Sequence, residues 1–442
     1  MTASTTHDQR GLGAAGAAVA VAAMVTNGLA YLVPMLGARR LPAADLSVLA
    51  TVLALVAIAG VAGMGLQMAV AVHRARHPDA TTARVGAATT AATTGLLVVA
   101  APLMVLGLHL PVGVVALLVV MTVPVVLAGR WLGELQGGQR FVRLAWAMGL
   151  LALGRYAGMV VALVLGVGLV DTLLVGTVTG YATLPLLAWL ARRQPPSAAT
   201  QPTTTGDDLR VRQVMSAGTA ALAMLVVSYA DLIFARQLLS PADSGAYAVG
   251  TVLTKGALWA PQVVTVLALP RLAVGDQQIR RAALIVVTAC GAVLVAVSAL
   301  AGGLAFRLAG GEDYAHLGEY APYFAATGGL YALVFVIVNA KVATAARWPS
   351  APLWVAAGGL AVLTVLIAPG TFQGIMFSAL GTATLTTLGT VVGPALVNRG
   401  AGGSRRKDPT DQGIVGSPAA PAQARSHSSA PSRLRRVTRS TR

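Results

Sequence analysis

The chain has 442 residues, of which 56% are hydrophobic and only 11% are charged, and its mean hydropathy is +0.73. A soluble domain carries about 25% charged residues, so this composition excludes a soluble globular protein. The single cysteine, Cys290, excludes an intramolecular disulfide and a cluster of thiolate metal ligands.

Apolar stretches of the length that crosses a bilayer recur along the chain between short polar breaks. They predict an all-α polytopic membrane protein with about twelve transmembrane helices in two six-helix bundles. The predicted spans, in chain order, are 13–36, 46–70, 86–108, 111–129, 144–167, 170–190, 213–235, 245–269, 282–306, 319–340, 351–369 and 372–397.

The breaks between these spans divide the chain into five parts. We expect a cytoplasmic N-terminus at 1–10, bundles at 11–191 and 213–397, and a linker at 192–212 that is rich in Pro and Thr. Because the first span is followed by eleven others, we interpret it as a retained helix and not as a signal peptide. Residues 398–442 predict a disordered cytoplasmic tail that supplies +8 of the net charge of +17 and suits an anionic lipid surface or plain solvent.

Basic residues in the short loops predict the orientation. Loops after even-numbered helices carry fifteen Arg or Lys and loops after odd-numbered helices carry four. The positive-inside rule therefore places both termini in the cytoplasm, in a plasma-membrane protein.

The two bundles resemble each other in sequence. The end of the first helix and the turn after it, 37–53, match 234–253 at an offset near 200 residues. Since each half has an even number of spans, the halves would be parallel repeats related by an axis along the membrane normal.

No catalytic constellation is present in the sequence. It lacks paired carboxylates, a His cluster with metal spacing and a phosphate-binding loop with a Lys. We therefore expect a transporter and not an enzyme, with no cofactor, no metal and no nucleic-acid partner.

Two cations lie near the centres of predicted helices, Arg155 in the fifth and Lys255 in the eighth. Ionisable groups at this depth cost about 2.5–3.5 kcal/mol to insert and usually face a polar cavity. With no acid at the same depth, the pair predicts an anionic substrate, the Arg fork suiting a diphosphate. The alternative is that each cation contacts backbone carbonyls and serves packing alone.

Four further polar residues are candidates for the cavity or for ion coupling. Asp231, near the outer end of the seventh helix, would bind a coupling proton or cation, or would pair with Arg236 or another outer Arg. Asn27, Tyr31 and Asn339 would line the cavity or join helices by hydrogen bonds.

Four stretches resemble polysaccharide flippases of the Wzx type, in the multidrug/oligosaccharidyl-lipid/polysaccharide exporter superfamily: 36–42 (LGARRLP), 133–141 (GELQGGQRF), 229–236 (YADLIFAR) and 240–247 (SPADSGAY). The resemblance extends over about residues 11–397. It implies two bundles in a V, alternating access, and transfer of a polyprenyl-diphosphate-linked oligosaccharide, a cell-envelope polysaccharide precursor, across the membrane. Lipids and polysaccharide assembly enzymes are the partners that it implies.

Two other functions remain open. A multidrug or cation antiporter of the same superfamily would prefer carboxylates in its cavity, and few are embedded here. An integral-membrane glycan polymerase or ligase would carry a large outer loop, whereas the longest outer loop predicted, near 307–318, is short.

Overall fold

The computed structural model describes residues 3–76, 81–192, 211–273, 277–343, 348–367 and 370–403. Within these ranges the chain is helical and contains no strand. The long helices are α1 (Ala3–Arg40), α2 (Ala43–Arg76), α3 (Ala83–Gly107), α4 (Val112–Gly137), α5 (Phe141–Ala152), α7 (Leu169–Ala191), α8 (Val211–Leu238), α9 (Pro241–Ala273), α10 (Gln277–Leu300), α12 (Ala321–Ala343), α13 (Ala351–Val362) and α14 (Phe372–Gly403). Shorter segments are η1 (Leu153–Ala157), α6 (Gly158–Val164), α11 (Gly302–Gly310), η2 (Glu312–Tyr320) and η3 (Leu363–Ile367).

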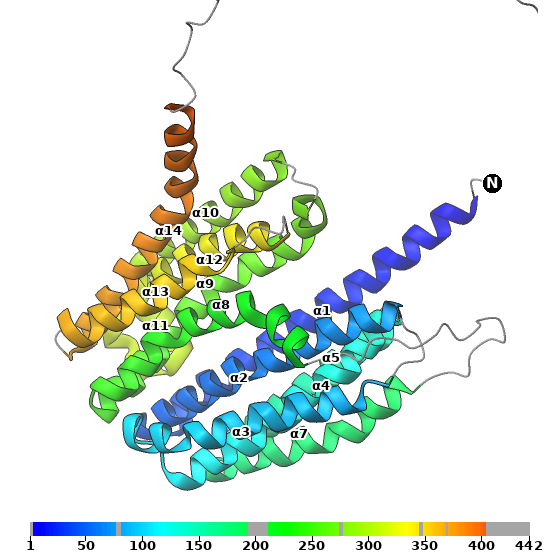
Figure 1. Ribbon diagram of the computed structural model, residues 1–442. Helices are drawn as coiled ribbons and strands as arrows, with labels where there is room; N and C mark the ends of the chain where they lie inside the picture. The colour runs from blue at the N-terminus through cyan, green and yellow to red at the C-terminus, as the bar shows by residue number, and fades with distance from the viewer. Residues whose placement is uncertain are drawn as a thin grey trace, which may run out of the picture. The chain divides into compact units, whose positions relative to one another are not determined.

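The predicted spans coincide with helices of the structure to within a few residues at most ends. Nine helical stretches of the described chain are long and apolar enough to cross a membrane. A helix satisfies all its backbone polar groups internally, which hydrocarbon requires of any segment that crosses it. The chain is therefore a multi-pass membrane protein, and we call α1–α7 its N-terminal half and α8–α14 its C-terminal half (Figure 1).

The predicted span 282–306 is wrong at its C-terminal end. α10 stops at Leu300, and the apolar residues that follow form the separate helix α11. A Cβ atom on Gly302 would overlap the Gly318 carbonyl, so this glycine lets α11 fold back against η2. Hydropathy does not detect such a turn, because the turn is as apolar as the helix.

The linker 192–212 and the tail 398–442 lie almost wholly outside the described residues. The structure contributes only their edges, with α8 starting at Val211 and α14 ending at Gly403. The chain contacts define one compact unit up to Pro394 and a second from Ala395.

In the N-terminal half, α4 lies alongside α2, α3 and α7 (Figure 1). The closest approach is at Gly63 of α2 and Gly129 of α4, where a Cβ atom on Gly129 would overlap the Gly63 carbonyl. Small residues that let backbones touch are a main source of helix association in membranes. This crossing therefore fixes α2 against α4 backbone to backbone.

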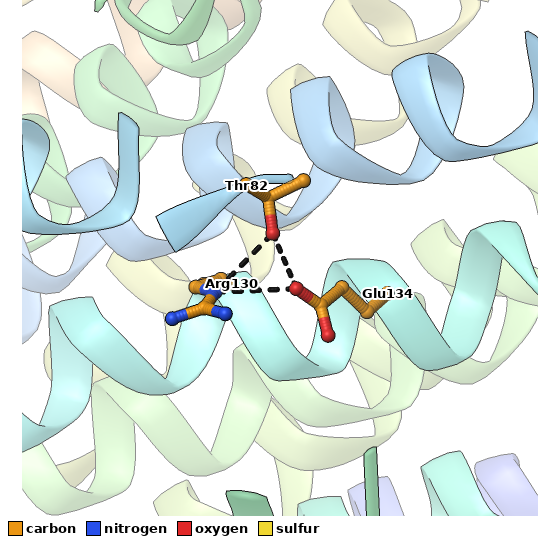
Figure 2. A network of polar contacts seen from close by, with 3 residues as sticks. All are labelled: Thr82, Arg130 and Glu134. Carbon is orange, nitrogen blue, oxygen red and sulfur yellow. Dashed lines mark hydrogen bonds and ion pairs between the residues drawn. The ribbon is translucent and has the colours of Figure 1, made fainter. Parts of the chain in front are cut away.

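A polar network closes one end of the α3–α4 pair (Figure 2). The Thr82 hydroxyl donates to the Glu134 carboxylate, and Arg130 Nε lies 3.2 Å from both the Thr82 hydroxyl and Glu134 Oε1. The network ties the residue before α3 to the last turns of α4.

In the C-terminal half, aromatic rings fill the core. Phe324 lies edge-on to Tyr247, with ring centroids 5.2 Å apart, and contacts Phe306 and Phe372 at 6.2 and 6.0 Å. Such edge-to-face contacts contribute beyond the area they bury. They connect α9, α11, α12 and α14.

Each half contains a π-helical turn in the fifth of its six long helices, counted without the short helix α11. In the N-terminal half it is η1, between α5 and α6, and in the C-terminal half it is η3, after α13. Their first residues, Leu153 and Leu363, differ by 210 positions, close to the offset of the sequence repeat. π turns accommodate one extra residue and are frequent at functional sites.

Candidate functional site

A cavity of about 260 Å³ lies where the two halves meet. Helices α1, α2 and η1 contribute to its wall from the N-terminal half, and α8, α9 and α12 contribute from the C-terminal half. Its polar lining consists of Asn27, Tyr31, Tyr156, Ser228, Tyr229, Thr251 and Lys255. The position of this cavity between the halves is where a transporter of two bundles holds its substrate.

Lys255 is the charged residue of this cavity. Its ammonium nitrogen lies 3.0 Å from the centroid of the Tyr229 ring and donates to the Ser228 carbonyl at 3.1 Å. The Tyr31 hydroxyl donates to the Lys255 carbonyl at 2.7 Å, so the two halves are bonded at this point. An ammonium over an aromatic face is stabilised by the ring quadrupole and keeps donors available for a ligand.

Arg155 lies in η1, beside a second and smaller cavity of about 130 Å³ within the N-terminal half. Its guanidinium carbon lies 4.9 Å from the centroid of the Tyr156 ring. Its Nε atom is buried and has no hydrogen-bond partner among the described residues. Buried donors are nearly always paired, so an orphan of this kind needs an explanation such as a missing ligand or water.

Tyr156 is shared by the two cavities, because it lines both. Arg155 also lies near enough to Tyr229 to interact with it electrostatically, and Tyr229 carries Lys255 on its face. The structure thus brings the two predicted cations toward the same pair of rings from opposite halves.

Asp231 lies outside this lining. It is only 4% exposed and accepts hydrogen bonds from the Leu232 amide at 2.8 Å and the Tyr247 hydroxyl at 3.2 Å. The predicted alternative, a pair with Arg236, is wrong, because Arg236 donates to Leu108, His109 and Ser47.

The three neutral candidates separate into two groups. Asn27 and Tyr31 line the larger cavity, one turn apart on α1. Asn339 is half-buried on α12 and does not belong to the described lining; the α12 residue that does is Phe335, one turn earlier.

Sequence reasoning missed the rings. Tyr156, Tyr229 and Phe335 line the cavity, and the Tyr229 ring contacts its cation. Aromatic residues are common in apolar helices and do not by themselves predict a binding site. The sequence marks these two tyrosines only by their position beside charged residues: Tyr156 follows Arg155, and Tyr229 lies two residues before Asp231.

The chemistry of the larger cavity is cationic and aromatic. Among its described lining residues one is a cation and none is Asp or Glu. A site with this lining offers charge and hydrogen-bond donors to an anion, and ring faces to sugar or apolar groups.

Comparison with solved structures identifies proteins that share the fold of this chain. The lipid II flippase MurJ in an inward closed conformation superimposes with a TM-score of 0.62 at 9% identity, over 85% of this chain and 87% of that one. A MATE family multidrug resistance transporter of the MOP superfamily, in an inward-facing conformation, gives a TM-score of 0.51 at 12% identity, over 84% and 95%. MATE in complex with MaD5 gives 0.53 at 13% identity, over 87% and 96%.

No family model and no curated protein matches the sequence. The likeness to these solved structures extends over 84% to 87% of this chain. The chain therefore has the fold shared by these MATE and MurJ transporters.

Proposed function

We propose that this protein is a membrane transporter, and specifically a flippase that moves a polyprenyl-diphosphate-linked oligosaccharide across the cytoplasmic membrane by alternating access. Both termini are cytoplasmic in this proposal. Lys255 and Arg155 hold the diphosphate, the rings between them contact the first sugar, and the lipid tail stays in the bilayer. Rocking of the two halves exposes the cavity to one side and then to the other.

The observation that carries the proposal is the orphaned Nε of Arg155. Embedding a guanidinium in a membrane helix is costly, and leaving one of its donors buried without an acceptor adds to that cost. A phosphate oxygen would satisfy this donor, and a guanidinium is well shaped to bind two such oxygens. Lys255, which belongs to the opposite half, would neutralise the second negative charge of the diphosphate. The fold shared with MurJ, which is named a lipid II flippase, supports a lipid-linked substrate.

A multidrug antiporter is the second candidate, because Asp231 is a buried carboxylate in the C-terminal half and the MATE transporters share the fold. An organic cation would be held by such a carboxylate. However, Asp231 is engaged with Tyr247 and lies outside the cavity lining, and Lys255 inside that lining would repel the cation.

The test is to follow lipid-linked saccharide in cells that depend on this protein. In the double variant Arg155→Gln, Lys255→Gln, polyprenyl-diphosphate-linked saccharide should accumulate in the inner leaflet as it does after depletion of the protein. The matched control is Arg84→Gln, which removes an exposed cation of α3 away from the cavity.

Two results would decide against the flippase. One is normal lipid-linked saccharide in a depleted strain that has become drug-sensitive, which assigns the protein to the antiporters. The other is wild-type transport by the double variant at a wild-type level in the membrane, which removes the diphosphate site.

A further inference from the structure

Two arginines occupy equivalent places in the two halves. Arg39 lies in the last turn of α1, before the turn into α2, and Arg236 lies in the last turn of α8, before the turn into α9. We call the end of the molecule that holds these two turns the hairpin end. The two residues are 197 positions apart, as are Ser47 and Ser244, which contact each other there.

Each arginine crosses to the opposite half. Arg39 donates through Nη2 to the Leu308 carbonyl at 2.9 Å, and Leu308 belongs to the last turn of α11. Arg236 donates to the carbonyls of Leu108 and His109, each at 3.2 Å, at the C-terminal end of α3. The acceptors Leu108 and Leu308 are 200 positions apart, and each lies in the segment that joins the third and fourth long helices of its half.

Both contacts have the same physical basis. The last four carbonyls of a helix have no partner within the helix and carry its negative dipole end, which favours a cation. Arg39 therefore caps a helix of the C-terminal half, and Arg236 caps a helix of the N-terminal half. The arrangement is reciprocal, as the repeat requires.

Between the two arginines the halves meet directly. The hydroxyl oxygens of Ser47 and Ser244 lie 2.5 Å apart with both residues fully buried, and Arg236 Nη1 reaches the Ser47 hydroxyl at 3.3 Å. A Cβ atom on Gly245 would overlap the Ala43 carbonyl, so α9 begins in contact with the beginning of α2. Leu46 and Ala50 of α2 pack beneath this contact with Tyr247 and Phe324 of the C-terminal half.

We propose that Arg39 and Arg236 form a symmetric double latch, which holds the hairpin end closed and must release before the cavity can open at that end. This inference rests on the proposed alternating access. Arg39 is exposed and Arg236 is half-buried, and their acceptors are neutral carbonyls. Water can take over such hydrogen bonds at small net cost, because folding and opening both exchange one partner for another. The latch therefore suits a contact that breaks in every transport cycle.

The latch is tested by measuring access to Ser244. In a background with Cys290→Ala, the reporter Ser244→Cys is exposed to a membrane-impermeant maleimide added outside intact cells. With both arginines present the labelling should be slow. With Arg39→Gln and Arg236→Gln it should rise by about tenfold, since a tenfold shift of a two-state equilibrium corresponds to about 1.4 kcal/mol, a modest net contribution from two hydrogen bonds.

The matched control is Arg40→Gln, which removes the neighbouring charge; the structure gives Arg40 no hydrogen bond or ion pair within its described ranges. Unchanged labelling in the double variant, or an equal rise with Arg40→Gln, would overturn the latch. This readout needs no substrate, so it is independent of whether the diphosphate site is correct.

A second measurement leaves the arginines in place. The pair Ser47→Cys, Ser244→Cys, oxidised in membranes, should form a disulfide that stops lipid-linked saccharide transfer, and reduction should restore it. Transfer that continues with the disulfide formed would show that the hairpin end does not open, and would contradict the proposal.

Discussion

Each half has six long helices, and the C-terminal half adds the short segments α11 and η2. In the N-terminal half, α2 and α4 meet backbone to backbone at Gly63 and Gly129. In the C-terminal half, α9 and α12 also meet closely, at Gly328 and the Thr254 carbonyl, but beneath the hairpin end the rings of Tyr247, Phe306 and Phe324 lie between the helices. Backbone contacts cannot give way without the helices separating, whereas rings can turn and slide past one another.

This difference predicts that one side of the cavity is more rigid than the other. The N-terminal half is the more rigid wall, held by glycine contacts and by the Thr82–Arg130–Glu134 network. The part of the C-terminal half that deforms is the ring-filled core beneath the hairpin end, where Tyr247 donates a hydrogen bond to Asp231.

The largest effect should come from the glycine contact. Gly129→Ala places a methyl group against the Gly63 carbonyl, and since neither backbone can yield, we expect a loss of about 3 kcal/mol in the free energy of unfolding. Denaturant unfolding in detergent, followed by circular dichroism, measures it. The control is Gly95→Ala on α3, where the space is open and little change is expected. Similar stability of the two variants would refute the rigid wall.

A smaller effect is expected from the ring-filled half. A methyl group at Gly250 would overlap the Phe324 ring, so Gly250→Ala should cost about 2 kcal/mol. Combining it with Phe324→Leu should recover about 1 kcal/mol of that cost, because the smaller side chain leaves room for the methyl group. A double-mutant cycle of unfolding free energies provides the measurement. If the changes in unfolding free energy of the two substitutions are strictly additive, the side chains of this core do not rearrange around the added methyl group.

The smallest effect should come from the polar network of Figure 2. Glu134→Gln removes the charge that Arg130 and Thr82 share, and we expect a loss of about 1 kcal/mol. Arg307→Gln is the control, because it breaks an exposed ion pair with Glu312 at 2.6 Å, a kind of contact worth little. The network would be dispensable if both variants unfolded at the same denaturant concentration.

Much of the fold could be predicted from the sequence, because a membrane-spanning helix needs a long run of apolar residues. The apolar runs predicted each long helix, but they missed the polar turns at the start of α1 and the end of α4, and they did not detect the apolar turn at Gly302–Gly303. The π turns could not be predicted, since they depend on helix packing and no residue type marks them.

The candidate site was predicted in part. Arg155, Lys255, Asn27 and Tyr31 stand out as polar residues in apolar helices; Arg155 lines the smaller cavity and the other three line the larger one. The predicted pairing of Asp231 with Arg236 fails on geometry, because residues five apart on a helix point about 140° away from each other. Tyr156 and Tyr229 carried no sequence signal of their own.

The π turn at η1 has an evolutionary consequence. Because a π turn holds one residue more than the α-helical path requires, it amounts to a single-codon insertion that leaves the rest of the helix intact. Arg155 and Tyr156 are neighbours within this turn, and the tyrosine lines both cavities whereas the arginine lines one. Losing one codon within the turn would return it to the α-helical path and leave the rest of the helix in place, so an ancestor could acquire or discard this arrangement in one step.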